Sequence, residues 1–210
     1  MPLMPASTRT RTDTPAAADR QRADTRSAIL DTSERLVQVR GFNGFSYGDV
    51  AGELAITKAA LHYHFPSKAD LGEALITRYA ERFAAALAAI DADGGAAPAK
   101  LDAYADLYAA VLREERMCLC GMLAAEYQTL PDPIRVAVID FLDANEVWLA
   151  RVLESGRDAG TLHFAGSAAD TGQSIVSGLE GALLVARPYG GVERFETAAR
   201  RLLAGLTGTA

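Results

Sequence analysis

The sequence predicts an all-α protein in which a three-helix N-terminal domain precedes a six-helix C-terminal domain. Apolar residues recur at the three- and four-residue spacing of amphipathic helices through most of the chain. No segment sustains the period-2 alternation of a half-buried strand. Separators rich in proline and glycine divide the second half of the chain, at residues 131–133, 160–166 and 188–191. We therefore divide the chain into a flexible tail (residues 1–22), a first domain (23–71) and a second domain (72–210).

The composition is that of a globular protein. Hydrophobic residues make up 50% of the 210 positions, which is enough to bury a sizeable core. No uncharged apolar run approaches the roughly 18 residues needed to cross a membrane, and the N-terminus lacks the apolar stretch of a secretory signal. We therefore expect a cytoplasmic protein with no membrane partner. The two cysteines, Cys118 and Cys120, suit a reducing compartment better than a disulfide framework.

The first helix is expected over residues 24–40, after a tail that lacks apolar periodicity. The tail is rich in Thr, Pro, Ala and Arg, which is typical of a chain that cannot bury a core. Apolar residues then recur at helical spacing up to Arg40. Gly41 follows as a C-terminal stop, because glycine adopts the left-handed conformation that often ends a helix.

A short helix and a tight turn follow in residues 46–57. Ser46 and Asp49 stand at the spacing of a capping box, so a helix begins directly after Ser46. The apolar residues on its inner face are Val50, Ala51 and Leu54. Residues 55–57 then form a three-residue turn.

A second short helix is expected over residues 58–64. Thr57 is placed to cap it, and Pro66 ends it because the proline ring disfavours helical geometry in the residue before it. Ser67 and Asp70 form another capping box, which opens a longer helix. Two short helices joined by such a turn are typical of a DNA-reading helix-turn-helix.

Residues 24–72 resemble the DNA-binding domain of the TetR (tetracycline-repressor-like) family. The matching positions are Gly41, Phe42, Phe45, Thr57, Lys58, Leu61, Tyr63, His64, Phe65, Lys68 and Leu71. The resemblance implies a homodimeric transcriptional regulator, more often a repressor, that binds a palindromic DNA operator and is released by a small-molecule effector. Ala55 departs from the family, which usually has glycine in this turn. An alanine held at positive φ costs about 1 kcal/mol or more, so the turn is either mildly strained or slightly reshaped.

The second short helix carries most of the expected base contacts. Lys58 stands at its N-terminus, where backbone N–H groups also point outward, and suits a phosphate or a guanine edge. Ala59 and Ala60 have no polar side-chain atoms, so they contact thymine methyl groups or permit close approach. His62, one turn further along, is expected to hydrogen-bond a base edge. His64 has two open interpretations, a DNA contact or a residue of the domain core.

Contacts with the DNA backbone are expected on both sides of that helix. Tyr63 and Lys68 suit phosphates, and Ser46 and Tyr47 suit the backbone from the preceding helix. Thr57, at the cap, belongs to the same expected surface. The arginines of the tail allow two interpretations: an inert solvated tail, which we favour, or an arm in the minor groove. These arginines are Arg9, Arg11, Arg20 and Arg22.

The net charge of −6 is unevenly distributed. Residues 1–80 carry 10 Lys and Arg against 9 Asp and Glu, whereas residues 81–210 carry 11 against 18. The acidic balance therefore lies away from the expected DNA contacts. The weakly basic first part predicts modest non-specific affinity, so pairing of two domains and the shape of the DNA should contribute to recognition.

Six further helices are expected over residues 68–90, 99–114, 117–129, 132–158, 168–187 and 192–206. The segment 117–130 gathers thiol, thioether and aromatic side chains that suit a pocket for a small apolar effector. We expect this pocket to include Cys118, Met122, Tyr127 and Trp148.

An alternative keeps the DNA-binding domain but makes the trigger covalent. Cys118 or Cys120 would then sense electrophiles or oxidants, with Arg113 and Arg116 lowering the thiol pKa. Some regulators of the family resembled carry a cysteine at the start of the equivalent helix, usually after glycine, whereas Cys118 follows Met117. A third interpretation treats both cysteines as small core residues.

The last two helices are expected to form the dimer interface. Small residues stand among large aliphatic ones in residues 168–187, and residues 192–206 carry an apolar side that includes Phe195, Ala199 and Leu203. In the family resembled, the last two helices of each subunit form a four-helix dimer bundle. The alternative is a helical hairpin within one chain.

No catalytic or metal-binding motif is found. The sequence contains no Gly-x-Ser-x-Gly, His-Glu-x-x-His or Walker motif. His62 and His64 diverge on a helix, since helical metal ligands are spaced three or four residues apart. We therefore expect neither enzymatic activity nor a cofactor or metal.

Overall fold

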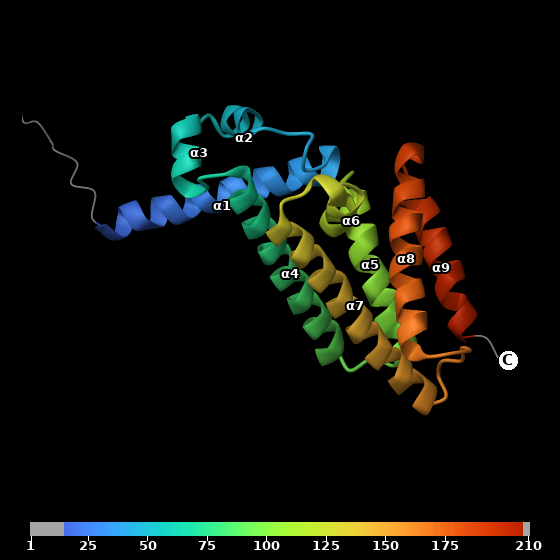
Figure 1. Ribbon diagram of the computed structural model, residues 1–210. Helices are drawn as coiled ribbons and strands as arrows, with labels where there is room; N and C mark the ends of the chain where they lie inside the picture. Colours follow the sequence, from blue (N-terminus) through green and yellow to red (C-terminus); the bar gives the residue numbers. More distant parts are fainter. Residues whose placement is uncertain (1–14, 208–210) are drawn as a thin grey trace, which may run out of the picture.

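The computed structural model describes residues 15–207, and the regular structure in that range is entirely helical (Figure 1). Nine α-helices and two short 3₁₀ turns follow one another in this part of the chain. Their bounds are α1 Pro15–Arg40, α2 Tyr47–Leu54, α3 Lys58–His64, α4 Lys68–Ala92, α5 Ala97–Arg113, α6 Leu119–Ala125, η1 Tyr127–Thr129, α7 Asp132–Asp158, α8 Ala168–Ala186, η2 Arg187–Tyr189 and α9 Val192–Thr207. The predicted all-α class is confirmed.

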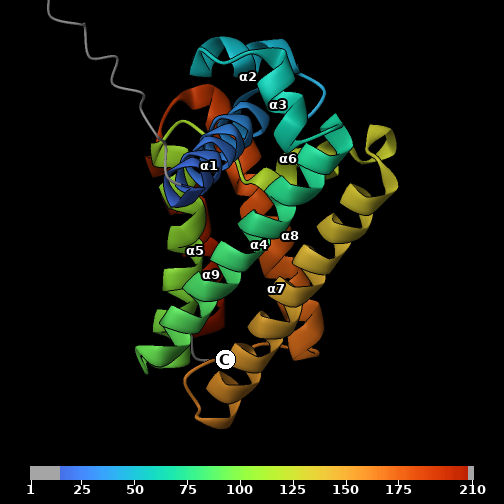
Figure 2. The ribbon, with the colours of Figure 1, turned by 90° about the vertical axis from the view of Figure 1, so that its left-hand side faces the viewer.

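The helices form a head and a body. The head consists of α1, α2 and α3, and the body of α4 to α9. α1 lies across one end of the body, and α2 and α3 lie on the side of α1 that faces away from the body (Figures 1 and 2). α4 leaves the head and runs along α7, while α8 and α9 pack side by side at the opposite edge of the body (Figure 1).

The first helix begins earlier than expected. α1 starts at Pro15, so the prediction of a flexible tail over residues 1–22 is wrong for residues 15–22. Proline is favoured in the first turn of a helix, and the alanine-rich run after it has high helix propensity. Arg20 and Arg22 lie exposed on this helix. The rest of the predicted tail, with the other two arginines, falls outside the described residues.

The sixth helix is shorter than the one predicted over residues 117–129. α6 covers only Leu119–Ala125 and is followed by η1. The N–H of Met117 donates to the carbonyl oxygen of Gln38 in α1 at 3.2 Å, so the start of this segment is tied to the head instead of being helical. No helix in residues 15–207 has the length and apolar character needed to span a membrane.

Glycines allow two close contacts, one between helices and one between a helix and a loop. A Cβ at Gly72 of α4 would lie 2.3 Å from Ile134 Cδ1 in α7 and 2.7 Å from the Phe42 ring of the head. A Cβ at Gly156 of α7 would lie 2.4 Å from Leu162 Cδ1. Real Cβ atoms do not approach other atoms so closely, so any larger residue at either position would force its neighbours to shift.

The apolar side of α9 packs within its own chain. Phe195, Ala199 and Leu203 are 1%, 4% and 6% exposed, and α9 contacts α5 and α8. These three side chains are therefore used inside the chain, and pairing of two copies through the last two helices stays a prediction that involves their outward sides. The outward sides of both helices remain exposed.

Candidate nucleic-acid interface and effector domain

The predicted capping box holds the start of α2. The carboxylate of Asp49 accepts hydrogen bonds from the backbone N–H of Ser46 at 2.7 Å and from the Ser46 hydroxyl at 2.6 Å. These bonds hold the pKa of Asp49 below its ordinary value. Ser46 is exposed, but its hydroxyl proton is directed to Asp49. Any contact of Ser46 with DNA therefore uses its oxygen as an acceptor.

The sequence allows either a strained or a reshaped turn between α2 and α3, and the structure has the strained form. Ala55 has φ 52° and ψ 38°, in the left-handed region. The N–H of Ile56 donates to the carbonyl oxygen of Ala51 at 3.0 Å, which ends α2. The turn thus keeps a shape that glycine adopts freely, at a cost of about 1 kcal/mol.

The inner face of α3 is fixed by a cap and by burial. Oγ1 of Thr57 accepts the N–H of Ala60 at 3.1 Å, as the sequence predicts. Leu61 and Phe65 are 0% and 3% exposed and anchor the helix on the head. His64 is half-buried. One face of α3 is therefore committed to the core of the head.

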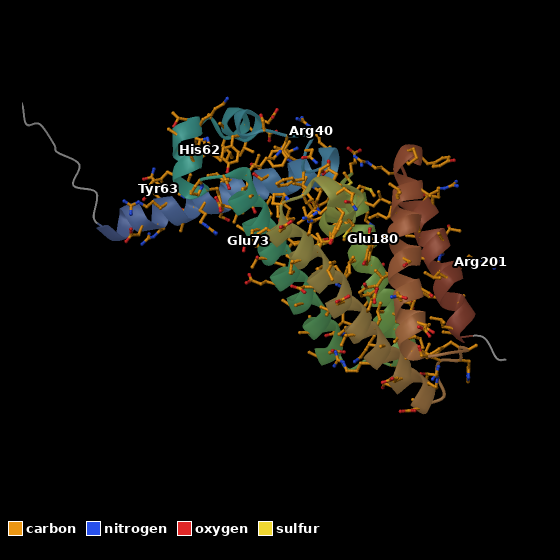
Figure 3. All side chains as sticks on the ribbon, viewed as in Figure 1. Arg40, His62, Tyr63, Glu73, Glu180 and Arg201 are labelled. Atoms are coloured by element: carbon orange, nitrogen blue, oxygen red, sulfur yellow. The ribbon has the colours of Figure 1, made fainter. Side chains whose placement is uncertain are left out.

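The opposite face of α3 is open to solvent. Lys58, Ala59, His62 and Tyr63 are exposed, with Tyr63 at 70%. Figure 3 places His62 and Tyr63 on the side of the head farthest from α8 and α9. Nδ1 of His62 lies 3.0 Å from the carbonyl oxygen of Pro66. Because a carbonyl oxygen only accepts, Nδ1 carries a proton and Nε2 is the free ring nitrogen.

Tyr47 is used inside the head. Its hydroxyl lies 2.8 Å from the carbonyl oxygen of Phe65 and 2.6 Å from that of Ser67. Its ring packs on His62 with the centroids 4.7 Å apart. Burial raises the pKa of Tyr47 to about 12. The hydroxyl therefore connects α2 to the end of α3 by hydrogen bonds, which corrects the expectation that it contacts the DNA backbone.

Lys68 points inward, contrary to the expectation of a phosphate contact. Its Nζ donates to the carbonyl oxygen of Phe45 at 2.5 Å. Nζ also lies 4.8 Å from the ring centroid of Phe42 and 4.3 Å from that of Phe45. Burial lowers the pKa of Lys68. This lysine ties α4 to the loop before α2, because hydrogen bonding and cation–π contacts both hold it there.

The predicted effector residues lie in different parts of the body, and their role in effector binding stays a prediction. The guanidinium carbon of Arg135, near the start of α7, lies 5.8 Å from the ring centroid of Tyr127. Trp148 is 13 residues further along α7 than Arg135, which is about 20 Å at the rise of an α-helix. Met122 faces Arg187, with Nη1 3.8 Å from Sδ. Only Cys118 and Trp148 adjoin the aromatic side chains of the body interior.

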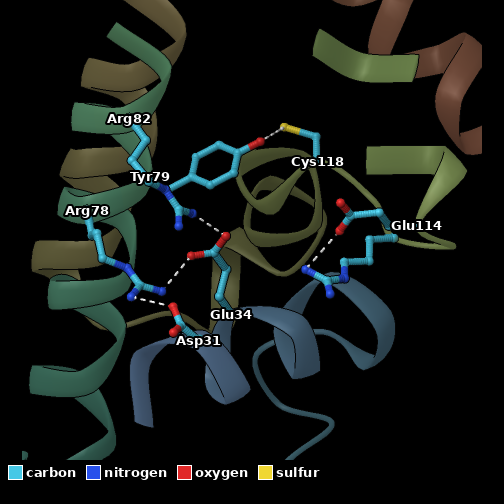
Figure 4. Close-up of polar contacts among 8 residues, drawn as sticks. Asp31, Glu34, Arg78, Tyr79, Arg82, Glu114 and Cys118 are labelled. Atoms are coloured by element: carbon cyan, nitrogen blue, oxygen red, sulfur yellow. Dashed lines mark hydrogen bonds and ion pairs between the residues drawn. The ribbon is translucent and has the colours of Figure 1, made fainter. Parts of the chain in front are cut away.

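Both cysteines are buried, which argues against a thiolate trigger. Cys118 and Cys120 are 1% and 0% exposed, and burial raises the pKa of both thiols well above the ordinary value. Arg113 instead forms an ion pair with Glu196 at 2.6 Å, and Arg116 forms one with Glu114 at 3.2 Å (the latter in Figure 4). The prediction that these arginines lower a thiol pKa is therefore wrong.

The interior of the body holds an aromatic cluster centred on Phe83 of α4. Its neighbours, by distance between ring centroids, are Tyr104 (6.1 Å), Tyr108 (6.2 Å), Phe141 (5.1 Å) and Tyr79 (6.2 Å). Trp148 stacks on Tyr104 at 5.5 Å. Helical periodicity marks these positions as core, but it does not indicate that rings from three helices meet at one place.

Two sets of carboxylate contacts also join the head to the body. In the first, the buried carboxylate of Glu34 in α1 binds Arg78 at 2.9 Å and also Arg82, both from α4 (Figure 4). Asp31 binds the same Arg78 at 2.7 Å. These pairs connect the helix across the top of the body to the helix that leaves the head.

The second set joins the loop after α1 to the end of α6. The carboxylate of Glu126 accepts the N–H of Phe42 at 2.5 Å and that of Asn43 at 3.3 Å. Gly41 has φ 85°, and a Cβ there would lie 2.8 Å from Glu126 Oε1. Glycine is required at this position for both its conformation and the close approach of the carboxylate.

Known protein families match both halves of the chain. Residues 29–75 match the tetR family of bacterial regulatory proteins, and residues 97–202 match the tetracyclin repressor-like C-terminal domain. The chain belongs to the TetR family. This TetR-family chain is 28% identical over 152 residues to the transcriptional regulator AcuR of Cereibacter sphaeroides, covering 70% of the chain and 69% of AcuR. It is 27% identical over 182 residues to the repressor NemR of Escherichia coli K12, covering 83% and 90%.

Solved structures of other family members share the fold. A TetR-family regulator from Agrobacterium tumefaciens superposes with a TM-score of 0.86 at 28% identity, over 89% of this chain and 100% of that one. A TetR regulator from Legionella pneumophila gives 0.79 at 34% identity, over 87% and 97%. The resemblance of residues 24–72 to the family is confirmed, and the protein is a ligand-responsive, DNA-binding transcriptional regulator.

Proposed function

We propose that this TetR-family regulator represses transcription as a homodimer that binds a palindromic operator through α3. The supporting observation is the solvent-facing side of α3, where Lys58, His62 and Tyr63 stand above a capped and buried inner face. A helix presented in this way fits the major groove. Lys58 binds a phosphate or guanine, and Nε2 of His62, the ring nitrogen that is not bonded to Pro66, hydrogen-bonds a base edge.

The outward sides of α8 and α9 support pairing of two copies. Ser177, Gly181 and Leu184 follow one another along the exposed side of α8. A Cβ at Gly181 would meet nothing within 4 Å in its own chain. Leu184 and Val185 are 61% and 53% exposed. Small residues beside exposed aliphatic ones allow a second helix to approach closely and bury apolar surface.

Release by an effector follows from the position of α4. This helix contributes Phe83 to the aromatic cluster, and Lys68 and Arg78 to the contacts with the head. A ligand that displaces the cluster therefore displaces α4 and changes the separation of the two heads. Effector and operator then weaken each other's binding by the same factor.

Operator binding is tested with inverted-repeat fragments from the region upstream of the protein's own gene. We expect sequence-specific binding that Lys58→Ala and Tyr63→Ala weaken without changing the circular dichroism spectrum. Arg151→Ala removes an exposed cation of the body and serves as the control. The proposal fails if no fragment is bound at low ionic strength, or if both α3 variants bind as the wild type does.

The interface is tested with a large substitution at an open position. Gly181→Arg should give monomers in sedimentation analysis, because the new side chain has room in its own chain but not in the dimer. Ala85→Arg, at an exposed position of α4, is the matched control and should remain dimeric. A dimeric Gly181→Arg variant would exclude this interface.

A further inference from the structure

One carboxylate in the body lacks a cationic partner. Glu180 of α8 lies on the side of that helix that faces the interior of the body (Figure 3). Its Oε1 is shielded from solvent and accepts no hydrogen bond from residues 15–207. Its other oxygen faces α6, where a Cβ at Gly121 would lie 2.3 Å from Oε2. A carboxylate in such a place is costly unless a donor or cation satisfies it, so a missing partner is indicated.

The groups around Glu180 are neutral. Cys118 lies near Glu180, and the Tyr79 hydroxyl donates to Cys118 Sγ at 3.6 Å (Figure 4). Burial and, to a smaller extent, the charge of Glu180 raise the pKa of Tyr104 and Tyr108. None of the ion pairs found in residues 15–207 involves Glu180. A partner from outside the chain is therefore needed to balance a charge at this position.

The surroundings favour a positively charged partner. Tyr79, Tyr104 and Tyr108 belong to the aromatic cluster and are at most 8% exposed. Aromatic faces attract cations, and the attraction is larger where water is excluded. Neutral hydroxyls and a thiol also leave the positive charge of a ligand unopposed. The same aromatic side chains would not stabilise an anion beside Glu180, because their ring faces attract cations.

A groove leads to the other side of the cluster. It opens between α4 and α7, has a volume of about 410 Å³, and has Phe83 and Phe141 in its lining. The charged residues among those that line it are Glu81 and Asp140, both acidic. A cation with an apolar body would therefore meet favourable charge at the groove and again at Glu180.

We propose that the effector is an organic amine with an apolar or aromatic body, whose ammonium group pairs with Glu180 after entry through the α4–α7 groove. This inference rests on the proposed function and gives the chemical class of its effector. The ammonium supplies the donors that the carboxylate lacks, in a charge-assisted hydrogen bond. The ligand must move Phe83 aside, and because Phe83 belongs to α4, that movement reaches the head.

The test compares three ligands that share one ring and differ in charge. Benzylamine, benzyl alcohol and benzoate are titrated into the full-length protein by calorimetry. The wild type should bind benzylamine roughly tenfold or more tightly than benzyl alcohol, as a charge-assisted bond requires. Glu180→Gln, which keeps shape and removes charge, should bind the two with equal affinity. Glu154→Gln, at an exposed position of α7, is the matched control and should retain the preference.

Several results would overturn the inference. They are equal affinities for the amine and the alcohol in the wild type, no detectable binding of benzylamine at millimolar concentration, or a preference that survives in Glu180→Gln. A preference for benzoate that depends on Glu180 would assign a protonated carboxyl group and also exclude an amine effector. Operator binding without ligand is measured separately. A protein that binds benzylamine through Glu180 but no operator refutes the proposed function, whereas the reverse result refutes only the effector class.

Discussion

Glu126 should contribute substantially to the stability of the junction between head and body. Its Oε2 accepts the N–H of Phe42 at 2.5 Å, and both of its oxygens lie 3.3 Å from the N–H of Asn43. Phe42 is 4% exposed, so its N–H has little access to water once the carboxylate is removed. A buried donor left without a partner carries its full desolvation penalty. We therefore predict a large effect from a single substitution at this position.

The magnitude follows from the geometry. A hydrogen bond to a charged acceptor contributes about 1.5–3 kcal/mol, and the longer contacts with Asn43 add little. Glu126→Ala should therefore lower the free energy of unfolding by about 2 kcal/mol. Glu126→Gln retains an acceptor oxygen without the charge and should cost about half as much. Glu114→Ala removes an exposed pair with Arg116 and, as the control, should cost roughly 0–0.5 kcal/mol.

Urea denaturation at one fixed protein concentration measures these differences, because dimer stability depends on concentration. Hydrogen exchange of the Phe42 amide gives an independent local measurement, and its protection should fall in Glu126→Ala. The reasoning is refuted if Glu126→Ala unfolds within about 0.5 kcal/mol of the wild type while the Phe42 amide stays protected.

Three further predictions concern other single residues. Ala55→Gly should raise the free energy of unfolding by about 0.5–1 kcal/mol, because relief of the left-handed strain exceeds the entropy that glycine loses on folding. Urea denaturation measures this gain, and the absence of a gain would mean that the turn is unstrained. Lys58→Ala should lower the slope of log operator affinity against log salt concentration by about one. Lys68→Met should leave this slope unchanged and lower the free energy of unfolding. Equal slopes for the two variants would contradict the inward position of Lys68. Burial raises the pKa of Glu180, so the stability contributed by its protonated form is present at low pH and is lost as pH rises through the folded-state pKa. Above its ordinary value of 4.5, thermal unfolding should show the wild type losing stability relative to Glu180→Gln as pH rises, and a constant difference would contradict the burial of this carboxyl group.

The elements of the head could be predicted because their signals are local. Ser46 and Asp49 interact three residues apart, and so do Thr57 and Ala60. A cap depends on backbone groups of the same turn, so its residues and spacing are visible in the sequence. For Ala55 the resemblance to the family left two forms of the turn open, and the structure decided for the left-handed one. The early start of α1 was missed because an alanine-rich run without apolar periodicity gives no packing signal.

The contacts that decide the candidate site span long distances in the sequence. Lys68 binds the carbonyl of a residue 23 positions earlier, and Glu126 binds an N–H 84 positions earlier. Helical periodicity shows that a residue faces inward, but not which side chain of another helix it meets. For this reason the sequence favours a DNA contact for Lys68, although its Nζ binds the carbonyl oxygen of Phe45. For the same reason it suggests a thiol partner for Arg113 and Arg116, although both pair with glutamates.

The sequence by itself determined the all-α class, the helix-turn-helix and the lysine at the start of α3. These depend on spacing within one or two helical turns. Only the tertiary structure decided that the thiols are buried, that Tyr47 and Lys68 are used inside the head, and that Oε1 of Glu180 is shielded from solvent without a hydrogen-bond partner in residues 15–207. Those outcomes depend on how helices distant in the sequence pack together, and packing sets the burial, charge and hydrogen bonding of each side chain.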